Sequence, residues 1–350
     1  MRPLPQGSTI GILGGGQLGR LLAGAAAKLG YDTCIFTPES DSPASRVAKH
    51  TIVGDYTDEE ALSNFTARCD AITYEFENVP VDSAVWLEGV GSDVRPGSKA
   101  LEMAQDRLTE KRFLQGIGIQ TVDIAEINDP GQIDAALNTM NGAGILKRRR
   151  DGYDGKGQAR IVSGDDYSEA WKALGEAPCI LEAMAPFERE ISGIVARTVD
   201  GQIAAFEPSE NIHENGILRS SIVPADINDD VRKRAVAGAT ALAAALDYVG
   251  VLALEYFVMP DGELLANEYA PRVHNSGHWT PEACETGQFE QHIRAVAGLP
   301  LGAPTRHFAA RMENLLGEEA IAAAGEPGVT LYGKREARAG RKMGHRVTVF

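Results

Sequence analysis

The chain has 350 residues, of which 43% are hydrophobic, and a formal net charge of -15. No apolar run approaches the roughly 18 residues of a membrane-spanning helix, so we expect a soluble protein of two or three domains. The negative charge repels polyphosphate backbones at long range, so we expect no nucleic-acid partner.

The chain opens with a pattern of strand, glycine turn, helix and strand. A β-like run at 9–13 is followed by the turn Gly14–Gly19, an alanine-rich helix and a second strand at 33–36. The turn matches the Gly-x-Gly-x-x-Gly spacing of dinucleotide sites, but the carboxylate expected about 20 residues on, Glu39, follows a proline. Because a helix N-terminus binds any phosphate, a ribonucleotide phosphate is an alternative ligand, and simple packing is another.

Further β-like runs at 51–53 and 71–74 extend this start into a small parallel sheet that ends near Val94. A linker at 95–98 leads to a charged helical segment, which we expect to present mostly a solvent-exposed face. Its charges are Asp106, Arg107, Glu110, Lys111 and Arg112. We expect a domain boundary after residue 112.

The next unit has the size of a lid, with strands at 144–147, 158–162 and 179–183 and a helix at 165–174. Its first hairpin carries a basic, glycine-rich loop from 147 to 157. Glycines let backbone N–H groups approach an anion, and lysines supply charge for phosphate oxygens. We interpret the loop as a phosphate-binding hairpin; the alternatives are a basic surface turn and a nucleic-acid patch.

Antiparallel strands are predicted at 189–198, 202–207 and 218–223, then a helix at 229–246. A hairpin follows, with strands at 251–258 and 263–268 and a turn at 259–262. Residues 306–350 are predicted to form a short β-rich cap.

Glu255 and Glu268 lie in apolar surroundings on this hairpin. A two-residue turn at Asp261-Gly262 makes them cross-strand neighbours, whereas a loop that includes Pro260 places Glu255 opposite Asn267. Two carboxylates about 5 Å apart repel by roughly 3 kcal/mol at an effective dielectric of about 20, so a cation or a proton is needed between them. Oxygen ligands beside a polyphosphate favour Mg²⁺; the alternative is that one carboxylate is solvated on the other face.

The run 271–279 follows directly and holds an arginine, two histidines and an asparagine, which suits a small oxyanion. His274 and His278 could also be zinc ligands, but a suitably placed third ligand is lacking. No nucleophile signature is present, so we expect no covalent enzyme intermediate.

Taken together, these segments resemble the ATP-grasp superfamily and, within it, the 5-(carboxyamino)imidazole ribonucleotide synthases. The segments that carry the resemblance are Gly14–Arg20, Tyr74–Pro80, Lys147–Gln158, Gly216–Ser221, Asn267–Thr280 and Leu331–Lys334. It implies a mixed α/β and α+β protein of ATP-grasp architecture. Its parts would be an N-terminal Rossmann-like domain (1–112), a lid (113–184), a body with the metal site (185–305) and a β-rich C-terminal cap (306–350).

The resemblance also implies roles for single residues. Around ATP it places Arg107, Lys147, Gly152, Tyr153, Asp154, Gly155, Lys156, Gly157, Gln158, Glu182, Ala183, Met184, Ala185, Glu190, His213, Asn267 and Glu268. Mg²⁺ would be held by Glu255 and Glu268, and Ala270 stands where many relatives have a third ligand. Around aminoimidazole ribonucleotide it places Gln17, Leu18, Glu75, Tyr153, Asp154, Lys334 and Arg341.

Such an enzyme carboxylates aminoimidazole ribonucleotide with bicarbonate and ATP in purine biosynthesis. Bicarbonate is a poor electrophile, so ATP must activate it as carboxyphosphate, which needs cations on a phosphoryl group in transit. The catalytic residues implied are Asp154, Arg272, His274, Asn275 and Lys334, with Arg272, His274 and Asn275 at bicarbonate and Asp154 positioning or deprotonating the amine. The alternatives are another ATP-grasp carboxylate-amine ligase, a Rossmann NAD(P)-dependent oxidoreductase and a non-catalytic nucleotide-binding protein.

Location and assembly complete the expectations. The four cysteines form no Cys-x-x-Cys pair and indicate reduced thiols of a cytoplasmic protein. Residues 1–6 show no secretory signal. The resemblance implies a homodimer.

Overall fold

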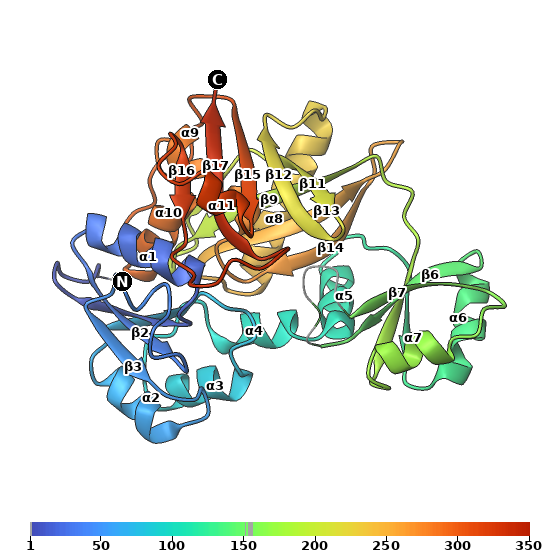
Figure 1. Ribbon diagram of the computed structural model, residues 1–350, viewed down its shortest axis with the longest axis horizontal. Helices are drawn as coiled ribbons and strands as arrows, with labels where there is room; N and C mark the ends of the chain where they lie inside the picture. The colour runs from blue at the N-terminus through green and yellow to red at the C-terminus, as the bar shows by residue number, and fades with distance from the viewer. Residues whose placement is uncertain (1, 151, 153–156) are drawn as a thin grey trace.

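The computed structural model describes residues 2–150, 152 and 157–350, which form three β-sheets (Figure 1). The first is a four-stranded parallel sheet of order β3-β2-β1-β4. Its strands are β1 (Thr9–Leu13), β2 (Asp32–Thr37), β3 (His50–Val53) and β4 (Ala71–Tyr74), with helices α1 (Gln17–Lys28), α2 (Glu59–Thr66) and α3 (Val81–Gly89). This is the parallel sheet that the sequence predicts, and Val94 adds a parallel bridge to Ile72.

Two helices, α4 (Ser98–Ala104) and α5 (Arg107–Gly116), connect this sheet to the rest of the molecule. The expectation that the charges of this segment face solvent is wrong for Asp106, Glu110 and Lys111, which are at most 3% exposed. Each has internal partners; the Asp106 carboxylate, for example, caps α5 by accepting from Leu108 and Thr109 N–H. A charge pattern cannot show partners that other segments supply.

The lid is a separate four-stranded sheet of order β5-β8-β6-β7. It contains β5 (Ile124–Ile127), β6 (Ala143–Arg148), β7 (Gln158–Val162), β8 (Cys179–Ala183), α6 (Ile133–Thr139) and α7 (Ser168–Ala173). Neither β5 nor α6 was predicted. The lid has its own apolar core, in which Ile127, Leu146 and Leu181 are fully buried.

The third sheet has nine strands in the order β14-β13-β9-β11-β12-β15-β17-β16, with β10 paired to β9. The strands are β9 (Arg189–Arg197), β10 (Ile203–Ala205), β11 (Ser209–Glu214), β12 (Ile217–Val223), β13 (Gly250–Val258), β14 (Leu264–Ala270), β15 (Ala310–Leu316), β16 (Val329–Leu331) and β17 (Lys342–Val349). Helices α8 (Asp229–Ala245), α9 (Thr280–Ala283), α10 (Gln288–Val296) and α11 (Glu319–Ala322) accompany it. The C-terminal strands β15, β16 and β17 therefore continue the body sheet, and the division of the chain at 112, 184 and 305 stays a prediction.

The N-terminal sheet and the large sheet share one core. Helix α1 packs on α10, and Leu22 and Ile293 belong to the same buried cluster. The Lys28–Glu290 ion pair, with Nζ and Oε2 2.7 Å apart, lies at the rim of this contact. These two parts thus form a continuous body, beside which the lid stands with its separate core (Figure 1). No helix in the described part of the chain is both long and apolar enough to cross a membrane.

We expect Gly11→Ala to lower the free energy of unfolding by about 1–3 kcal/mol, because overpacking a tight core has costs in that range. A Cβ at Gly11 would meet Phe65 Cζ at 2.6 Å and Cys69 Sγ at 2.7 Å. The matched control is Gly24→Ala in α1, where a Cβ meets nothing within 4 Å; it should stabilise the fold by up to about 1 kcal/mol. Chemical denaturation measures both, and equal stabilities would contradict this packing.

Candidate active site

The hairpin of β13 and β14 realises both registers that the sequence left open. Near the turn, Met259 N–H donates to Glu263 O at 2.9 Å and Tyr256 faces Ala266, so Pro260 is part of the loop. Beyond an irregularity in the pairing, Leu254 faces Tyr269. One residue of β13, Glu255, therefore lies opposite two of β14, which are Asn267 and Glu268. The bulge puts both carboxylates at the same place in the hairpin.

The two carboxylates influence each other strongly. Burial, and then the charge of Glu268, raises the pKa of Glu255. Burial also acts to raise the pKa of Glu268, but Arg107 outweighs it and holds that pKa low; Arg107 Nη1 lies 2.8 Å from Glu268 Oε2. The Glu255 side chain is 12% exposed, whereas that of Glu268 is 43% exposed. This pair of hard oxygen donors fits a divalent cation such as Mg²⁺. Ala270, next but one, is buried in the same strand and supplies no side-chain donor.

Glu182, which is predicted among the residues around ATP, lies between two lysines. Its Oε2 accepts from Lys147 Nζ at 2.6 Å, and its Oε1 lies 3.3 Å from Lys111 Nζ. Burial opposes ionisation of Glu182, yet the two ammonium groups lower its pKa to about 2. Burial lowers the pKa of Lys111, and Glu182 opposes this. With oxygen acceptors around Nζ, we take the charged form of Lys111 as the one for which the site is built.

Other residues predicted around ATP lie on the same elements. Arg107 also donates to Gly152 O at 3.3 Å, which joins α5 to the phosphate-binding hairpin. Gln158 begins β7 and pairs with Lys147. Tyr153, Asp154, Gly155 and Lys156 lie outside the described residues; Gly157 is described and has a φ of +73°.

Ala183 ends β8, and Met184 and Ala185 follow it; Met184 is exposed. Close to it in sequence, the Phe187 ring stacks on Phe257 with centroids 4.4 Å apart. Phe257 faces Glu190 across the sheet. Glu190 Oε2 in turn lies 3.2 Å from His213 Nδ1, and this pairing outweighs burial and raises the His213 pKa.

The segment predicted to bind bicarbonate is fixed by partners far away in sequence. Arg272 makes two contacts with the Glu77 carboxylate, one of them 2.7 Å between Nη2 and Oε1. Burial, and then Arg272, lowers the His274 pKa to about 3, so this imidazole is neutral near pH 7. His274 Nε2 lies 3.6 Å from Glu255, and the Asn275 amide pairs with that of Asn314. Arg272, His274 and Asn275 thus lie directly after the hairpin that carries Glu255 and Glu268.

The glycine turn before α1 packs against Glu75. Glu75 Oε1 accepts from Gly16 N–H at 2.7 Å and Oε2 from Gly19 N–H at 3.2 Å. A Cβ at Gly14 would lie 2.6 Å from Glu75, and Gly14 has a φ of +113°, so the turn needs glycine there. Gln17 and Leu18 begin α1 between the two bonded N–H groups.

Lys334 and Arg341, the two C-terminal residues predicted around the ribonucleotide, differ in their contacts. Lys334 Nζ donates to Lys342 O at 2.7 Å and lies 5.7 Å from the centre of the Tyr332 ring. The preceding Gly333 accepts through its carbonyl from Arg46 Nη1 at 2.7 Å, which ties this loop to the N-terminal sheet. Arg341 is exposed and donates to Glu336 O at 3.1 Å. The described contacts thus link the neighbours of Lys334, Gly333 and Arg335, to the N-terminal part.

Sequence reasoning missed Glu110 and Lys111, and gave no role to Glu77 or Asn314. Two features of the sequence could have pointed to these residues. Glu77 lies in a segment that carries the family resemblance, and Lys111 follows Arg107 by one helical turn, on the same face of the helix.

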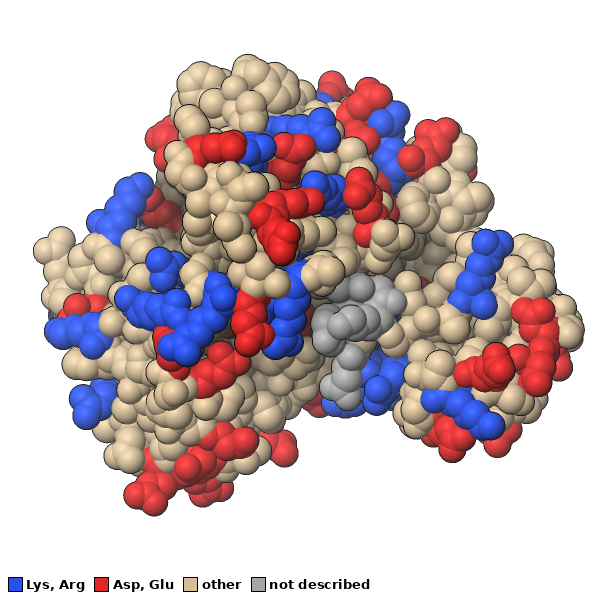
Figure 2. Space-filling model, viewed as in Figure 1, with Lys and Arg blue, Asp and Glu red and all other residues tan. Residues whose placement is uncertain are grey.

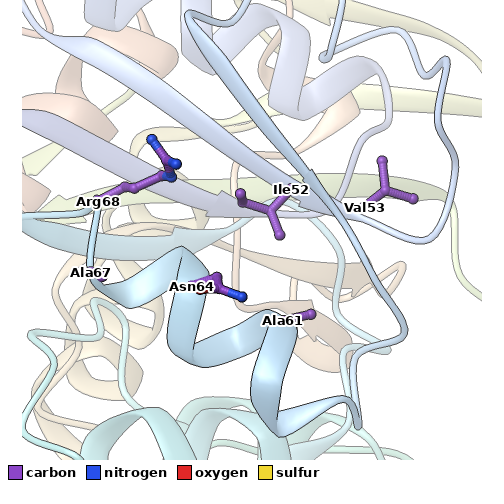
Figure 3. A pocket seen from close by; sticks show the side chains of 6 residues that line it. All are labelled: Ile52, Val53, Ala61, Asn64, Ala67 and Arg68. Carbon is purple, nitrogen blue, oxygen red and sulfur yellow. The ribbon is translucent and has the colours of Figure 1, made fainter.

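One surface hollow lies apart from the residues described above. A hollow of about 550 Å³ lies between β3 and α2, lined by Ile52, Val53, Ala61, Asn64, Ala67 and Arg68 (Figure 3). It shares no residue with the constellation above. Figure 2 shows a notch between the lid and the N-terminal part, with Lys and Arg side chains on its border.

Comparisons with known proteins match this chain along nearly its whole length. A family model described as ATP-grasp domain matches residues 112–289. A ribonucleotide synthetase preATP-grasp domain matches 7–105, and a phosphoribosylaminoimidazole carboxylase C-terminal domain matches 310–350. A curated relative from Brucella melitensis, N5-carboxyaminoimidazole ribonucleotide synthase, is 53% identical over 98% of this chain and 96% of its own.

The chain belongs to the N5-carboxyaminoimidazole ribonucleotide synthase family. A solved ADP complex of an N5-carboxyaminoimidazole ribonucleotide synthetase aligns with a TM-score of 0.95 and 42% identity over 100% of this chain and 94% of the other. An Aspergillus clavatus N5-carboxyaminoimidazole synthase with ADP and 5-aminoimidazole ribonucleotide aligns at 0.91 and 29% identity over 99% and 94%. The predicted ATP-grasp architecture is confirmed, and the chain is an ATP-dependent ligase of this synthase family. The roles of single residues stay predictions.

We expect Glu182→Gln to destabilise the protein by about 3 kcal/mol at pH 7, because it leaves buried lysine charge uncompensated. The Glu182 pKa is about 2 in the folded chain and about 4.3 when unfolded, so its contribution is full above about pH 4.3 and is lost as the pH falls toward 2. Denaturation of wild type and variant between pH 7 and pH 3 should show the gap narrowing with acid. A gap independent of pH would contradict the role of the charge.

Proposed function

We propose that this protein carboxylates 5-aminoimidazole ribonucleotide with bicarbonate, consuming ATP and releasing the 5-carboxyamino product, ADP and phosphate. This is a step of purine biosynthesis. The observation that carries the proposal is the agreement, over 99% of the chain, with a synthase that binds ADP and 5-aminoimidazole ribonucleotide together. The charged groups around Glu182, Glu268 and Arg272 supply the chemistry that such substrates need.

ATP would lie between the lid and the large sheet. Lys147 and Arg107 are the cations offered to its phosphates, and the glycines at 152 and 157 flank the loop over them. Glu255 and Glu268 would hold Mg²⁺, which supplies positive charge to the transferring phosphoryl group when bound. The ion pair of Arg107 with Glu268 keeps the arginine next to this position.

Bicarbonate would bind at Arg272, His274 and Asn275. Glu77 holds the Arg272 guanidinium in one plane, which suits a planar oxyanion. The His274 imidazole, neutral near pH 7, offers a hydrogen bond without adding charge, and its Nδ1 is already engaged with Ser276 Oγ at 2.8 Å. These partners support a site that orients bicarbonate while leaving its oxygen nucleophilic.

The reaction would proceed by phosphoryl transfer from ATP to a bicarbonate oxygen, with ADP leaving. The resulting carboxyphosphate delivers its carbon, directly or as CO₂, to the amine of the ribonucleotide, and phosphate leaves. Asp154, outside the described residues, is our candidate for positioning that amine or taking its proton. Lys334 and Glu75 would contact the ribonucleotide from opposite ends of the chain. Water must be kept out because carboxyphosphate hydrolyses, which gives the lid a purpose.

Two further expectations belong to the proposal. We infer a cytoplasmic location, which the four free cysteines support, and a homodimer, which the family resemblance supports. Light scattering of the purified protein tests the dimer.

The function predicts that ADP release requires all three substrates. A coupled assay should show little ADP formation with ATP alone and a strong increase when bicarbonate and 5-aminoimidazole ribonucleotide are both present. The carboxyamino product should form with one ADP each. ADP release that ignores the ribonucleotide, or depends on another amine instead, would replace the proposed substrate.

We expect Glu268→Gln to lower kcat by at least about 10²-fold, because one of the two anionic ligands for the cation is lost. The melting temperature should fall modestly, since the ion pair with Arg107 is lost together with the repulsion from Glu255. The matched control is Glu263→Gln, an exposed acid just before the same strand, which should keep full activity. Turnover by Glu268→Gln at saturating Mg²⁺ close to the wild-type rate would remove Glu268 from the metal site.

A further inference from the structure

Strand β14, which carries Glu268, lies at the edge of the large sheet. An edge strand leaves backbone N–H and C=O groups without a strand partner, and a bulge disturbs the pairing on its other side as well. On the open side of β14 an isolated bridge joins Ala266 to Thr121, and Ala266 N–H donates to Gln120 O at 2.7 Å. In the described part of the chain no further bridge on that side supports residues 267–269, so another contact has to fix them.

Helix α5 supplies that support through two adjacent buried side chains. Glu110 Oε1 accepts from Tyr269 N–H at 2.7 Å, directly after Glu268. Lys111 Nζ donates to Asn267 O at 2.5 Å and approaches Ala266 O at 3.4 Å, directly before it. The backbone on both sides of Glu268 is thus held by side chains of one helical turn.

The same lysine also reaches the lid. Lys111 Nζ lies 3.3 Å from Glu182 Oε1, while the other Glu182 oxygen binds Lys147. Lys111 Nζ thus hydrogen-bonds two backbone oxygens of β14 and forms an ion pair with Glu182 on β8 of the lid. Figure 1 shows α5 between the lid and the large sheet. Lys111 is 0% exposed, so water cannot replace any of these partners.

We propose that Lys111, assisted by Glu110, is a positioning residue that joins the lid carboxylate Glu182 to the backbone beside Glu268, so that nucleotide and cation sites keep a fixed separation. Neither residue touches the reacting atoms. The proposal rests on the proposed function, because it takes Glu268 as a ligand of the cation. Its consequence is thermodynamic: the nucleotide and Mg²⁺ should strengthen each other's binding through this link.

The test is the affinity for ADP, measured by calorimetry with EDTA and then across a series of Mg²⁺ concentrations. Lys111→Met keeps the length of the side chain and removes its charge and donors. We expect its Kd for ADP in EDTA to stay within about threefold of wild type, while the Mg²⁺ concentration needed for half of the gain in affinity rises about tenfold. In turnover assays, kcat at fixed Mg²⁺ should fall more than the KM for ATP rises.

Arg112→Met is the matched control, since Arg112 is the next residue of α5, is 62% exposed and pairs with Glu126 at the surface. It should behave as wild type. A Lys111→Met series that superimposes on wild type overturns the proposal. So does equal weakening in EDTA and in Mg²⁺, which is the result of a merely structural role.

A second pair of variants keeps the test decisive if Lys111→Met does not fold. Glu110→Gln retains an oxygen that can accept from Tyr269 N–H, whereas Glu110→Leu does not. We expect Glu110→Leu to shift the Mg²⁺ series by about tenfold and Glu110→Gln to restore it. Equal behaviour of the two overturns the proposal. If wild-type ADP affinity did not respond to Mg²⁺ at all, the metal site and the proposed function would fail first.

Discussion

The repulsion between Glu255 and Glu268 is the constraint on which the rest of the site depends. Two carboxylates at one bulge of a hairpin repel each other unless positive charge is close. Arg107 supplies part of this positive charge through its 2.8 Å contact with Glu268. Lys147 and Lys111, which both pair with Glu182, supply the rest. Three carboxylates, Glu182, Glu255 and Glu268, thus lie among three cations, Arg107, Lys111 and Lys147, and each group is held in place by the others. A cation bound at Glu255 and Glu268 would relieve their repulsion.

Helix α5 is central to that balance. The N-terminal sheet and the large sheet share a core through α1 and α10, whereas the lid is built around its own core. Positions 107, 110 and 111 of α5 form one face of the helix, and they contact the metal strand and the lid at once. A lid with a separate core can move relative to the body. Such a movement has to keep or break the ion pairs of α5.

The segment after β2 contacts the loop that carries Lys334. Asp41 receives both Arg46 and Arg335, and Arg46 also donates to Gly333 O. The loop that carries Lys334 is thereby held against the segment following β2, close in the fold to the glycine turn of α1. This arrangement brings the Lys334 loop toward the N-terminal sheet, as the proposed ribonucleotide site requires. The C-terminal strands themselves are built into the large sheet rather than standing apart from it.

The sequence by itself determined the elements with short-range signals. Apolar runs and glycine turns predict the parallel N-terminal sheet, the lid hairpin and the β13–β14 hairpin, whose register brings Glu255 and Glu268 close together. The metal and bicarbonate roles of these residues and of the segment from Arg272 to Asn275 stay predictions. Only the tertiary structure decided the register at Glu255, where a bulge combines two alternatives, and the burial of Lys111, which looked like a surface charge. The reason is physical. A lysine is buried only when acceptors surround it, and those of Lys111 come from residues 182, 266 and 267, which folding alone brings to it.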